Sequence, residues 1–407
     1  MKVLIVQPTC DKRGHYGIWT TKMCQTLAKK GHSVTLCTNR LVPEKYLQEK
    51  PLFRLYEVEG GRYNFEKFDE ARSRHQLYYF YGYFSVCYHI TKAALSLSTR
   101  EGFDVIFITD AEFLLASLLL KRFSGRIPPV VMQVNAANFS FTTYAGSVFK
   151  KLYKVFQRSF FRRTLGKEIR GFAVLGEWHR ERLRCQLRLD EDFPIDVVPD
   201  AGDEPLEFMN KYDARRKLGI DYAGDILLFF GMLRKDKGIG ELLEAMRHVR
   251  TENFRLLVVG APTEYTEEEV RDIVKKNRIS DRVILRLEYV ADDEVPAYFF
   301  AADALVLPYS NIYTGGSGPL LKGACTYRRP VIVTDVSEMG RLTRQHGIGL
   351  LARPGDPHSL AEKMDEFLAM TENEREEMAK RSSYLAKLNS WGSVADKFVS
   401  LFNKVRH

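Results

Sequence analysis

The sequence lacks the features that mark several common protein classes. No stretch approaches the roughly 20 uninterrupted apolar residues of a membrane-spanning helix. The six cysteines are scattered and include no C-x-x-C pair, so the sequence predicts neither a disulfide framework nor a zinc site. The N-terminus MKVLIVQPT lacks the long apolar region and small-residue cleavage site of a signal peptide. It predicts a first buried strand instead, and we expect a cytoplasmic protein without a bound metal.

A dinucleotide fingerprint is also missing. The chain opens with a predicted strand, helix and second strand at residues 3–7, 19–30 and 33–38. A fingerprint would need G-x-G-x-x-G in the first turn and an acidic residue ending the second strand. The turn offers only Gly14 and Gly17, and the second strand ends in Thr38. The pattern therefore argues against an NAD enzyme.

The loop from Gly14 to Gly17, which includes His15 and Tyr16, has two interpretations. Its backbone amides could approach a phosphate or an acceptor group. Alternatively, its glycines serve only a tight turn.

The length of 407 residues is about twice that of a typical domain, which predicts two domains. We place them at residues 1–200 and 201–390, with a helix in 391–407 returning to the first. From Ile226 onward, apolar strands and helical segments alternate every 25–30 residues or so, which is typical of a parallel sheet covered on both faces. The predicted class is α/β, with two Rossmann-like halves.

The positive charge is concentrated in one segment. The formal net charge is +9, and residues 144–171 hold eight Lys or Arg against Glu168, leaving +2 for the rest. On a helical wheel for residues 147–163, one sector of about 160° is apolar and the opposite one is basic. The apolar positions are Val148, Phe149, Leu152, Tyr153, Val155, Phe156 and Phe160.

Such a helix has two interpretations. It fits the inner face of the plasma membrane, where anionic lipid would attract the basic side and the protein would be peripheral. Alternatively, it packs its apolar side on its own domain and exposes a solvated basic side. No nucleic-acid-binding module surrounds the patch, so we expect no nucleic-acid partner.

Polar residues follow two predicted strands of the first half. The strand over residues 105–109 leads to Asp110 and Glu112, and the strand over residues 130–134 ends at Asn135. In open α/β sheets, ligands bind beyond the carboxyl ends of the strands. These positions are therefore candidates for catalysis or acceptor binding.

The most informative turn follows the apolar strand that starts at Ile226. Three cations, Arg234, Lys235 and Lys237, lie in a turn framed by Gly231 and Gly238. Cations beyond a strand terminus most often bind phosphate, which makes this turn a candidate diphosphate site. Simple solvation of the three side chains is the alternative.

With this turn, the second half of the chain resembles a known family, the GT-B glycosyltransferases of glycosyltransferase family 4, also called group 1. Members carry a strand ending in Gly, a basic residue, then Lys-Gly and a helix with paired leucines. This chain matches with Gly231, Arg234, Lys237 and Gly238. The resemblance implies two Rossmann-like domains whose parallel sheets face each other across a cleft, with Arg234 and Lys237 clamping a diphosphate.

A second matching block runs from Leu307 to Val336 and contains a glycine-rich turn before a helix that starts near Pro319. The family binds the donor phosphates at such a helix start, where backbone N–H groups are free. The block and two flanking loops imply these donor-binding residues: Gly231, Gly260, Tyr289, Val290, Thr314, Gly315, Gly316, Ser317, Gly318, Pro319 and Leu320.

The sequence departs from the family at three positions. Many members carry two glutamates seven residues apart in this block, and the matching positions here are Thr314 and Lys322. The helix is one residue longer before Pro330, which could shift the second position to Gly323. The family's first-domain histidine near the sugar corresponds to Asn135.

The resemblance implies transfer of a sugar from a nucleoside-diphosphate sugar to a glycan, lipid-linked or small-molecule acceptor. It implies retention at the anomeric carbon and no metal or other cofactor. The base of the nucleotide is not indicated. An inverting enzyme would need a base such as Asp110, Glu112 or His15. The alternative function is a degenerate nucleotide-sugar-binding partner in a glycosylation complex, because both glutamates are missing.

Overall fold

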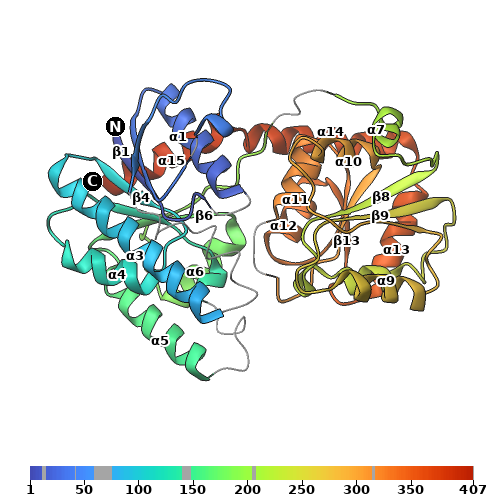
Figure 1. The fold of residues 1–407 in the computed structure, drawn as a ribbon, viewed down its shortest axis with the longest axis horizontal. Helices are drawn as coiled ribbons and strands as arrows, with labels where there is room; N and C mark the ends of the chain where they lie inside the picture. Colours follow the sequence, from blue (N-terminus) through green and yellow to red (C-terminus); the bar gives the residue numbers. More distant parts are fainter. Residues whose placement is uncertain are drawn as a thin grey trace. The chain divides into compact units, whose positions relative to one another are not determined.

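The chain forms two compact units in a computed structural model, which describes residues 1–11, 15–41, 43–58, 76–139, 148–203, 208–313 and 317–406. One unit is Met1–Pro199 with Trp391–His407, and the other is Asp200–Ser390. Each contains one parallel sheet between layers of helices (Figure 1). The predicted α/β class with two Rossmann-like halves is confirmed.

The first unit holds a seven-stranded parallel sheet of order β3-β2-β1-β4-β5-β6-β7. Its strands are β1 (Lys2–Gln7), β2 (Ser33–Thr38), β3 (Arg54–Glu57), β4 (Val105–Ile108), β5 (Val130–Gln133), β6 (Ile169–Val174) and β7 (Ile195–Val197). Its helices are α1 (His15–Lys29), α3 (Gln76–Arg100), α4 (Phe113–Arg122), α5 (Val148–Arg162), α6 (Glu177–Leu187) and α15 (Trp391–Arg406). Single 3-10 turns cover Pro43–Lys45 and Ala136–Phe139.

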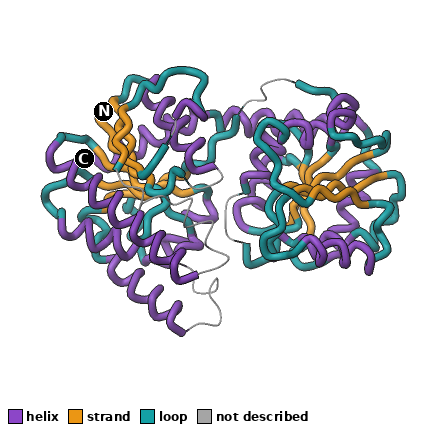
Figure 2. Tube along the Cα trace, in the orientation of Figure 1, coloured by secondary structure: helices purple, strands orange, loops and turns teal. Residues whose placement is uncertain are grey.

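The second unit holds a six-stranded parallel sheet of order β10-β9-β8-β11-β12-β13 (Figure 2). Its strands are β8 (Asp225–Phe230), β9 (Phe254–Val259), β10 (Val283–Arg286), β11 (Ala304–Leu307), β12 (Val331–Thr334) and β13 (Gly349–Ala352). Its helices are α7 (Lys211–Lys217), α8 (Ile239–Ala245), α9 (Glu267–Lys276), α10 (Val295–Ala301), α11 (Gly318–Leu321), α12 (Ser337–His346), α13 (Pro357–Leu368) and α14 (Glu372–Leu388).

The central strand β8 explains why continuous apolar runs encode this sheet. Ile226 and Leu228 belong to the core on one face, whereas Leu227 and Phe229 belong to the core on the other. A strand covered on both faces has no solvent side, so it needs no polar alternation.

The last helix packs in the first unit. Phe398 of α15 contacts Trp19 of α1 and Phe107 of β4, with ring centroids 5.9 and 4.7 Å apart. Helices α1 and α15 cover one face of the first sheet, and α3 and α4 cover the other. The helix begins at Trp391, at the start of the predicted range, whereas α4, α6 and α14 were not predicted. No described helix combines the length and apolar composition that spanning a membrane requires.

Candidate functional site

The second sheet reverses its strand order between β8 and β11, which pair as neighbours. The turn after β8 carries Gly231 to Gly238, and the segment after β11 leads to Ser317 and α11. Ligands of open α/β sheets bind at such a reversal, beyond the carboxyl ends of the strands. The two sequence motifs thus occupy one place in the fold.

Gly231 lies where these two motifs meet. It has φ +133°, and a Cβ added to it would lie 2.8 Å from the Nζ of Lys237 and 3.7 Å from the Cγ of Pro319. Lys237 and the start of α11 therefore both approach the end of β8. Gly260, at the end of the neighbouring strand β9, packs closely against Gly231. A Cβ on Gly260 would lie 2.0 Å from the carbonyl oxygen of Gly231, so a larger residue would displace the end of β8.

Gly238 closes the turn against the segment after β11. It has φ +68°, and an added Cβ would lie 1.8 Å from the carbonyl oxygen of Pro308. The backbone N–H of Ser310 donates to the carbonyl oxygen of Asp236 over 3.0 Å. Only glycine fits this contact, which holds the cation turn against the second motif.

The three cations of the turn have different environments. Arg234 donates from Nε and NH2 to the two carboxylate oxygens of Asp236, at 2.9 and 2.6 Å. Lys237 is half-buried, and its Nζ lies 5.5 Å from the centroid of the Tyr309 ring. Within the described part of the chain, no hydrogen bond or ion pair reaches the Lys237 ammonium. The Lys235 side chain is exposed.

The pKa of the Lys237 ammonium lies below the ordinary value for a lysine. Burial, and then the positive charge of Arg234, lower its pKa to about 8, against the opposing effect of Asp236. A half-buried ammonium that forms no hydrogen bond or ion pair with the described residues is suited to an anionic ligand, which would replace the lost solvation.

We expect pyrophosphate affinity to fall as pH rises above about 8. The unliganded lysine loses its proton near this pH, and only the protonated form attracts the anion. Isothermal titration calorimetry across this range measures the affinity, and buffers of different ionisation enthalpy measure proton uptake on binding. Lys237→Arg is the control for titration of pyrophosphate itself, because its guanidinium stays charged. Identical pH profiles for the two proteins would contradict this assignment.

Helix α11 begins as the motif predicts. The Ser317 hydroxyl caps it by accepting from the backbone N–H of Leu320 over 3.1 Å, and Pro319 lies in the first turn. Gly318 is exposed, and Leu320 is buried. The predicted residues Thr314, Gly315 and Gly316 lie outside the described part of the chain.

The extra residue before Pro330 has a structural cause. Helix α11 continues into a π-helical turn over Lys322–Thr326, and such a turn inserts one residue into a helix. A Cβ on Gly323 would lie 2.7 Å from the Cδ2 of Leu305, so this position has no space for a carboxylate side chain. Lys322 is exposed. Neither alignment of the second family glutamate supplies an acidic residue.

Only one of the two predicted donor-binding residues in the loop after β10 is accessible to a ligand. Tyr289 is 65% exposed, whereas Val290 is buried in the core. Tyr289 thus offers its ring for stacking, and Val290 anchors the loop.

The first sheet also reverses its strand order, between β1 and β4. Asp110 lies just beyond β4, and its carboxylate accepts a hydrogen bond from the Thr9 hydroxyl beyond β1. Its φ of +42° is unusual for a residue other than glycine, and such backbone strain is common at functional sites. The predicted Asp110 is thus at the position where this sheet would bind a ligand.

The predicted loop at the start of α1 is only partly described. Gly14 and the side chain of His15 lie outside the described structure, and Tyr16 is half-buried. A Cβ on Gly17 would lie 2.8 Å from the carbonyl oxygen of Cys10. Close packing therefore explains Gly17 without a phosphate.

Asn135 lies beside a histidine that the sequence did not identify. The backbone N–H of Ala136 donates to Nδ1 of His179 over 3.3 Å. The Oδ1 of Asn135 and the Nε2 of His179 are both buried without a hydrogen-bond partner among the described atoms. Burial lowers the pKa of His179 to about 4, so the ring is neutral. The only sequence signal was its position soon after β6.

Glu112 has a structural role rather than that of a base. Its carboxylate caps α4 by accepting from the backbone N–H groups of Leu114 and Leu115. It also accepts from the Tyr153 hydroxyl and the Gln157 amide of α5. These donors occupy both oxygens, so the suggestion that Glu112 activates an acceptor is not supported.

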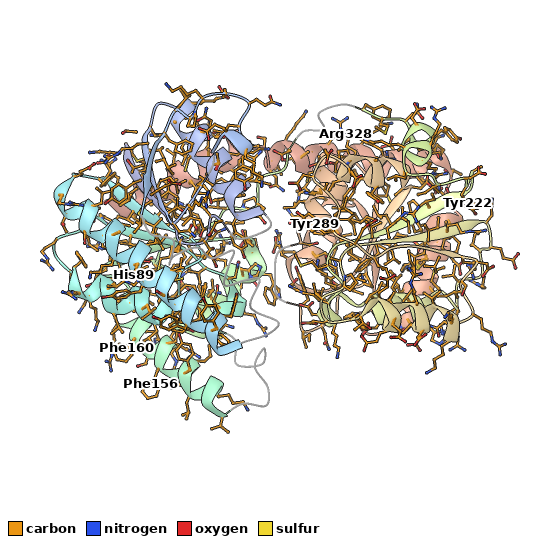
Figure 3. All side chains as sticks on the ribbon, in the orientation of Figure 1. His89, Phe156, Phe160, Tyr222, Tyr289 and Arg328 are labelled. Carbon is orange, nitrogen blue, oxygen red and sulfur yellow. The ribbon has the colours of Figure 1, made fainter. Side chains whose placement is uncertain are left out.

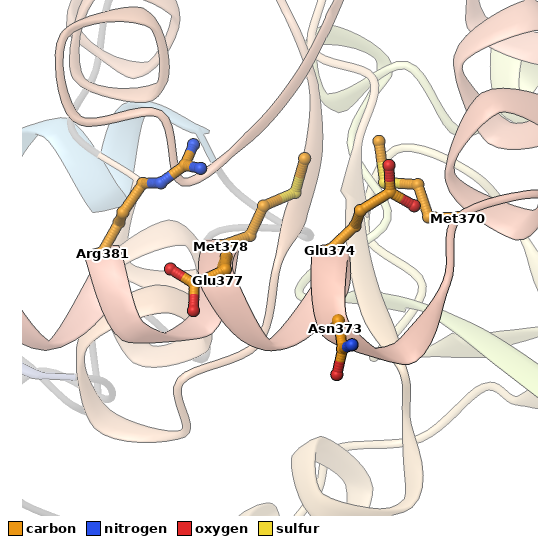
Figure 4. Close-up of a pocket in the computed structure, with 6 residues that line it drawn as sticks. All are labelled: Met370, Asn373, Glu374, Glu377, Met378 and Arg381. Atoms are coloured by element: carbon orange, nitrogen blue, oxygen red, sulfur yellow. The ribbon is translucent and has the colours of Figure 1, made fainter.

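A surface pocket of about 360 Å³ lies along α14 (Figure 4). Its charged residues serve local contacts: Glu374 caps the helix with Thr371, Glu377 pairs with Lys380, and Arg381 donates to the Gly347 carbonyl. None of its lining residues belongs to either motif of the second sheet. The pocket is a surface depression separate from the candidate site.

The model of the family described as glycosyl transferases group 1 matches residues 210–384. These residues belong to the group 1 glycosyltransferases. The glycosyltransferase domain contains both motifs, and the resemblance inferred from them is confirmed.

One protein of similar sequence and two solved structures of similar fold can be compared with this chain. D-inositol 3-phosphate glycosyltransferase of Pseudarthrobacter chlorophenolicus is 28% identical over 210 residues, which cover 49% of this chain and 48% of that protein. The chain thus spans about half the length of the curated relatives that it matches. Sucrose-phosphate synthase from Thermosynechococcus elongatus has a TM-score of 0.73 at 17% identity, covering 99% and 98% of the two chains. HepE from Anabaena, in complex with UDP-glucose, has a TM-score of 0.69 at 12% identity and covers 99% of each chain.

Proposed function

We propose that this protein transfers a sugar from a nucleoside-diphosphate sugar, bound to the second unit, to an acceptor bound to the first. The observation that carries the proposal is the pair Arg234 and Lys237 beside the start of α11, at the strand-order reversal of a group 1 glycosyltransferase domain. Among solved structures of similar fold, HepE is in complex with UDP-glucose.

The two cations would stabilise the leaving diphosphate. Cleavage of the bond between the anomeric carbon and the phosphate oxygen leaves a negative charge on that oxygen. Preorganised cations in a partly dry site stabilise such charge more effectively than water does. Lys237 would supply charge from one side, and Arg234, already oriented by Asp236, from the other. We propose that these residues, rather than a metal ion, neutralise the leaving group.

We propose retention at the anomeric carbon. In this chemistry, an oxygen of the departing phosphate accepts the proton of the acceptor hydroxyl as the new glycosidic bond forms on the same face. The mechanism needs no separate base. It agrees with the occupation of both Glu112 oxygens by hydrogen bonds from α4 and α5.

Asp110 and Asn135 are the proposed acceptor-side residues. Both follow central strands of the first sheet, and Asn135 has a buried Oδ1 without a partner among the described residues. An amide can bind a sugar hydroxyl as donor or acceptor. The acceptor would be a glycan, a lipid-linked sugar or a small molecule.

A panel of nucleoside diphosphates and their sugars, tested by thermal shift, is the direct test of donor binding. A ligand at 100 times its dissociation constant stabilises the folded protein by about 2.7 kcal/mol. We expect a clear shift with one base, and we expect Arg234→Ala to abolish it. Lys235→Ala is the matched control, because Lys235 is the exposed cation of the same turn.

The results of this panel and of an acceptor assay distinguish the transferase from the degenerate nucleotide-sugar-binding partner. Binding followed by product formation with an acceptor mixture supports the transferase. Binding without transfer or hydrolysis supports the degenerate partner, which the missing glutamates at Thr314 and Lys322 would favour. No shift with any nucleotide would contradict both.

A further inference from the structure

Helix α5 is attached to its unit through polar side chains. The Tyr153 hydroxyl and Gln157 amide donate to Glu112, and the Lys154 ammonium donates to the Asn138 carbonyl over 2.7 Å. Phe161 is the large apolar residue on this side, and its ring lies 5.3, 4.9 and 5.8 Å from those of Phe113, Phe139 and Phe172. The side of α5 that faces the protein is therefore largely polar.

The opposite side of α5 exposes apolar residues. Val148, Leu152, Val155 and Phe156 are 70%, 51%, 52% and 58% exposed. At 100° per residue these four positions span about 100° of the helix. A surface helix normally turns such an apolar sector toward the core. The alternative that this sector packs on its own domain is therefore wrong for these four residues. Phe156 is labelled in Figure 3, together with Phe160.

Basic residues flank the exposed apolar sector. Lys151 and Arg162 lie on one edge of the helix, Arg163 follows its end, and all three are exposed. The helix contains no Asp or Glu. Exposed basic residues thus border one edge of the apolar strip, and α5 has no acidic residue.

Helix α3 contacts the protein-facing side of α5 and exposes aromatic residues of its own. The Phe84 ring lies 6.1 Å from that of Tyr153 on α5. One turn earlier, Phe80 and Tyr81 are 46% and 70% exposed on the same side of α3. Aromatic rings are favoured at the boundary between lipid headgroups and acyl chains.

We propose that α5 docks the first unit on an anionic lipid bilayer. Leu152, Val155 and Phe156 would enter the boundary between headgroups and acyl chains, and Lys151 and Arg162 would contact lipid phosphates. Charge decides between lipid and a protein partner, since an apolar strip bordered by uniformly basic residues fits an extended anionic surface. This inference does not depend on the proposed donor site. Combined with glycosyl transfer, it favours a lipid-linked acceptor.

Vesicle flotation of the full chain tests the docking. We expect the protein to float with phosphatidylcholine vesicles containing about a third phosphatidylglycerol, and to float much less with phosphatidylcholine alone or at high salt. The double variants Leu152→Ser/Phe156→Ser and Lys151→Glu/Arg162→Glu should each lower the floated fraction at least about tenfold.

Matched controls use the second unit. Lys275→Glu/Lys276→Glu makes the same charge change on exposed residues of α9, and Phe208→Ser removes a side chain that is 81% exposed. Both should float like the wild type. A blue shift of tryptophan fluorescence that only Phe156→Trp acquires on adding vesicles would support insertion independently.

Three results would overturn the proposal. The first is flotation of both α5 double variants at the wild-type level. The second is absence of binding to anionic vesicles. The third is a dimer in solution that Leu152→Ser/Phe156→Ser dissociates, which would assign the strip to a second copy of the chain.

Discussion

Lys237→Ala is expected to lower kcat by about 10²- to 10³-fold, because removing one preorganised group that stabilises transition-state charge costs that much. The effect should exceed any change in KM. Lys237 lies beside Gly231 and close to the start of α11, where the diphosphate would develop its charge. Steady-state kinetics, with the donor and acceptor that the nucleotide panel and the acceptor mixture identify, measures the loss.

Two variants sharpen this test. Lys235→Ala removes an exposed cation two residues away and should leave kcat within about twofold of the wild type. Lys237→Arg keeps the charge but changes its shape, so it should recover part of the loss. Equal losses of kcat for Lys235→Ala and Lys237→Ala would contradict a specific role for Lys237, because they would mean that only the net charge of the turn matters.

Gly238→Ala should destabilise the second unit by about 3–5 kcal/mol. The added methyl group would combine a left-handed backbone, φ +68°, with a position 1.8 Å from the carbonyl oxygen of Pro308. The turn would have to move away from β11, and the donor site would be lost with it. Thermal unfolding followed by circular dichroism, together with the nucleotide panel, measures both effects.

Gly219→Ala is the matched control for this variant. Gly219 has a similar φ of +64° but no atom within 4 Å of an added Cβ. Its substitution should cost only about 1 kcal/mol, the price of the left-handed conformation. Similar losses for both variants would mean that the contact with Pro308 is unimportant.

The strands of both sheets were predictable because parallel strands buried on both faces leave uninterrupted apolar runs. The run at residues 226–230 is an example, and the predicted strand lies within one residue of β8. Helix α4 was missed although its sequence FLLASLLLKR is apolar, because apolar residues also occupy its exposed side, as Leu118 does at 45% exposure, and no polar face reveals a period.

The candidate site likewise has residues that the sequence predicted and residues that it did not. Glycines at fixed spacing around Arg234 and Lys237 identified the cation turn, because the close contacts leave no space for a side chain. His179 left no pattern, since its contact with the backbone N–H of Ala136 joins two turns that are distant in sequence. The wheel showed that α5 is amphipathic, but it took the hydrogen bonds to Glu112 and the exposed fractions of the apolar residues to reveal which side faces the protein.

The path of the chain between the units has a consequence for biosynthesis. The chain leaves the first unit after Pro199 and returns to it at Trp391. All of residues 200–390 are therefore translated before α15 exists. The second unit can complete its core on the ribosome, while the first still exposes the surface of Trp19 and Phe107 that Phe398 will cover. The first unit thus keeps this apolar surface uncovered for longer than the second unit, until the last helix is synthesised.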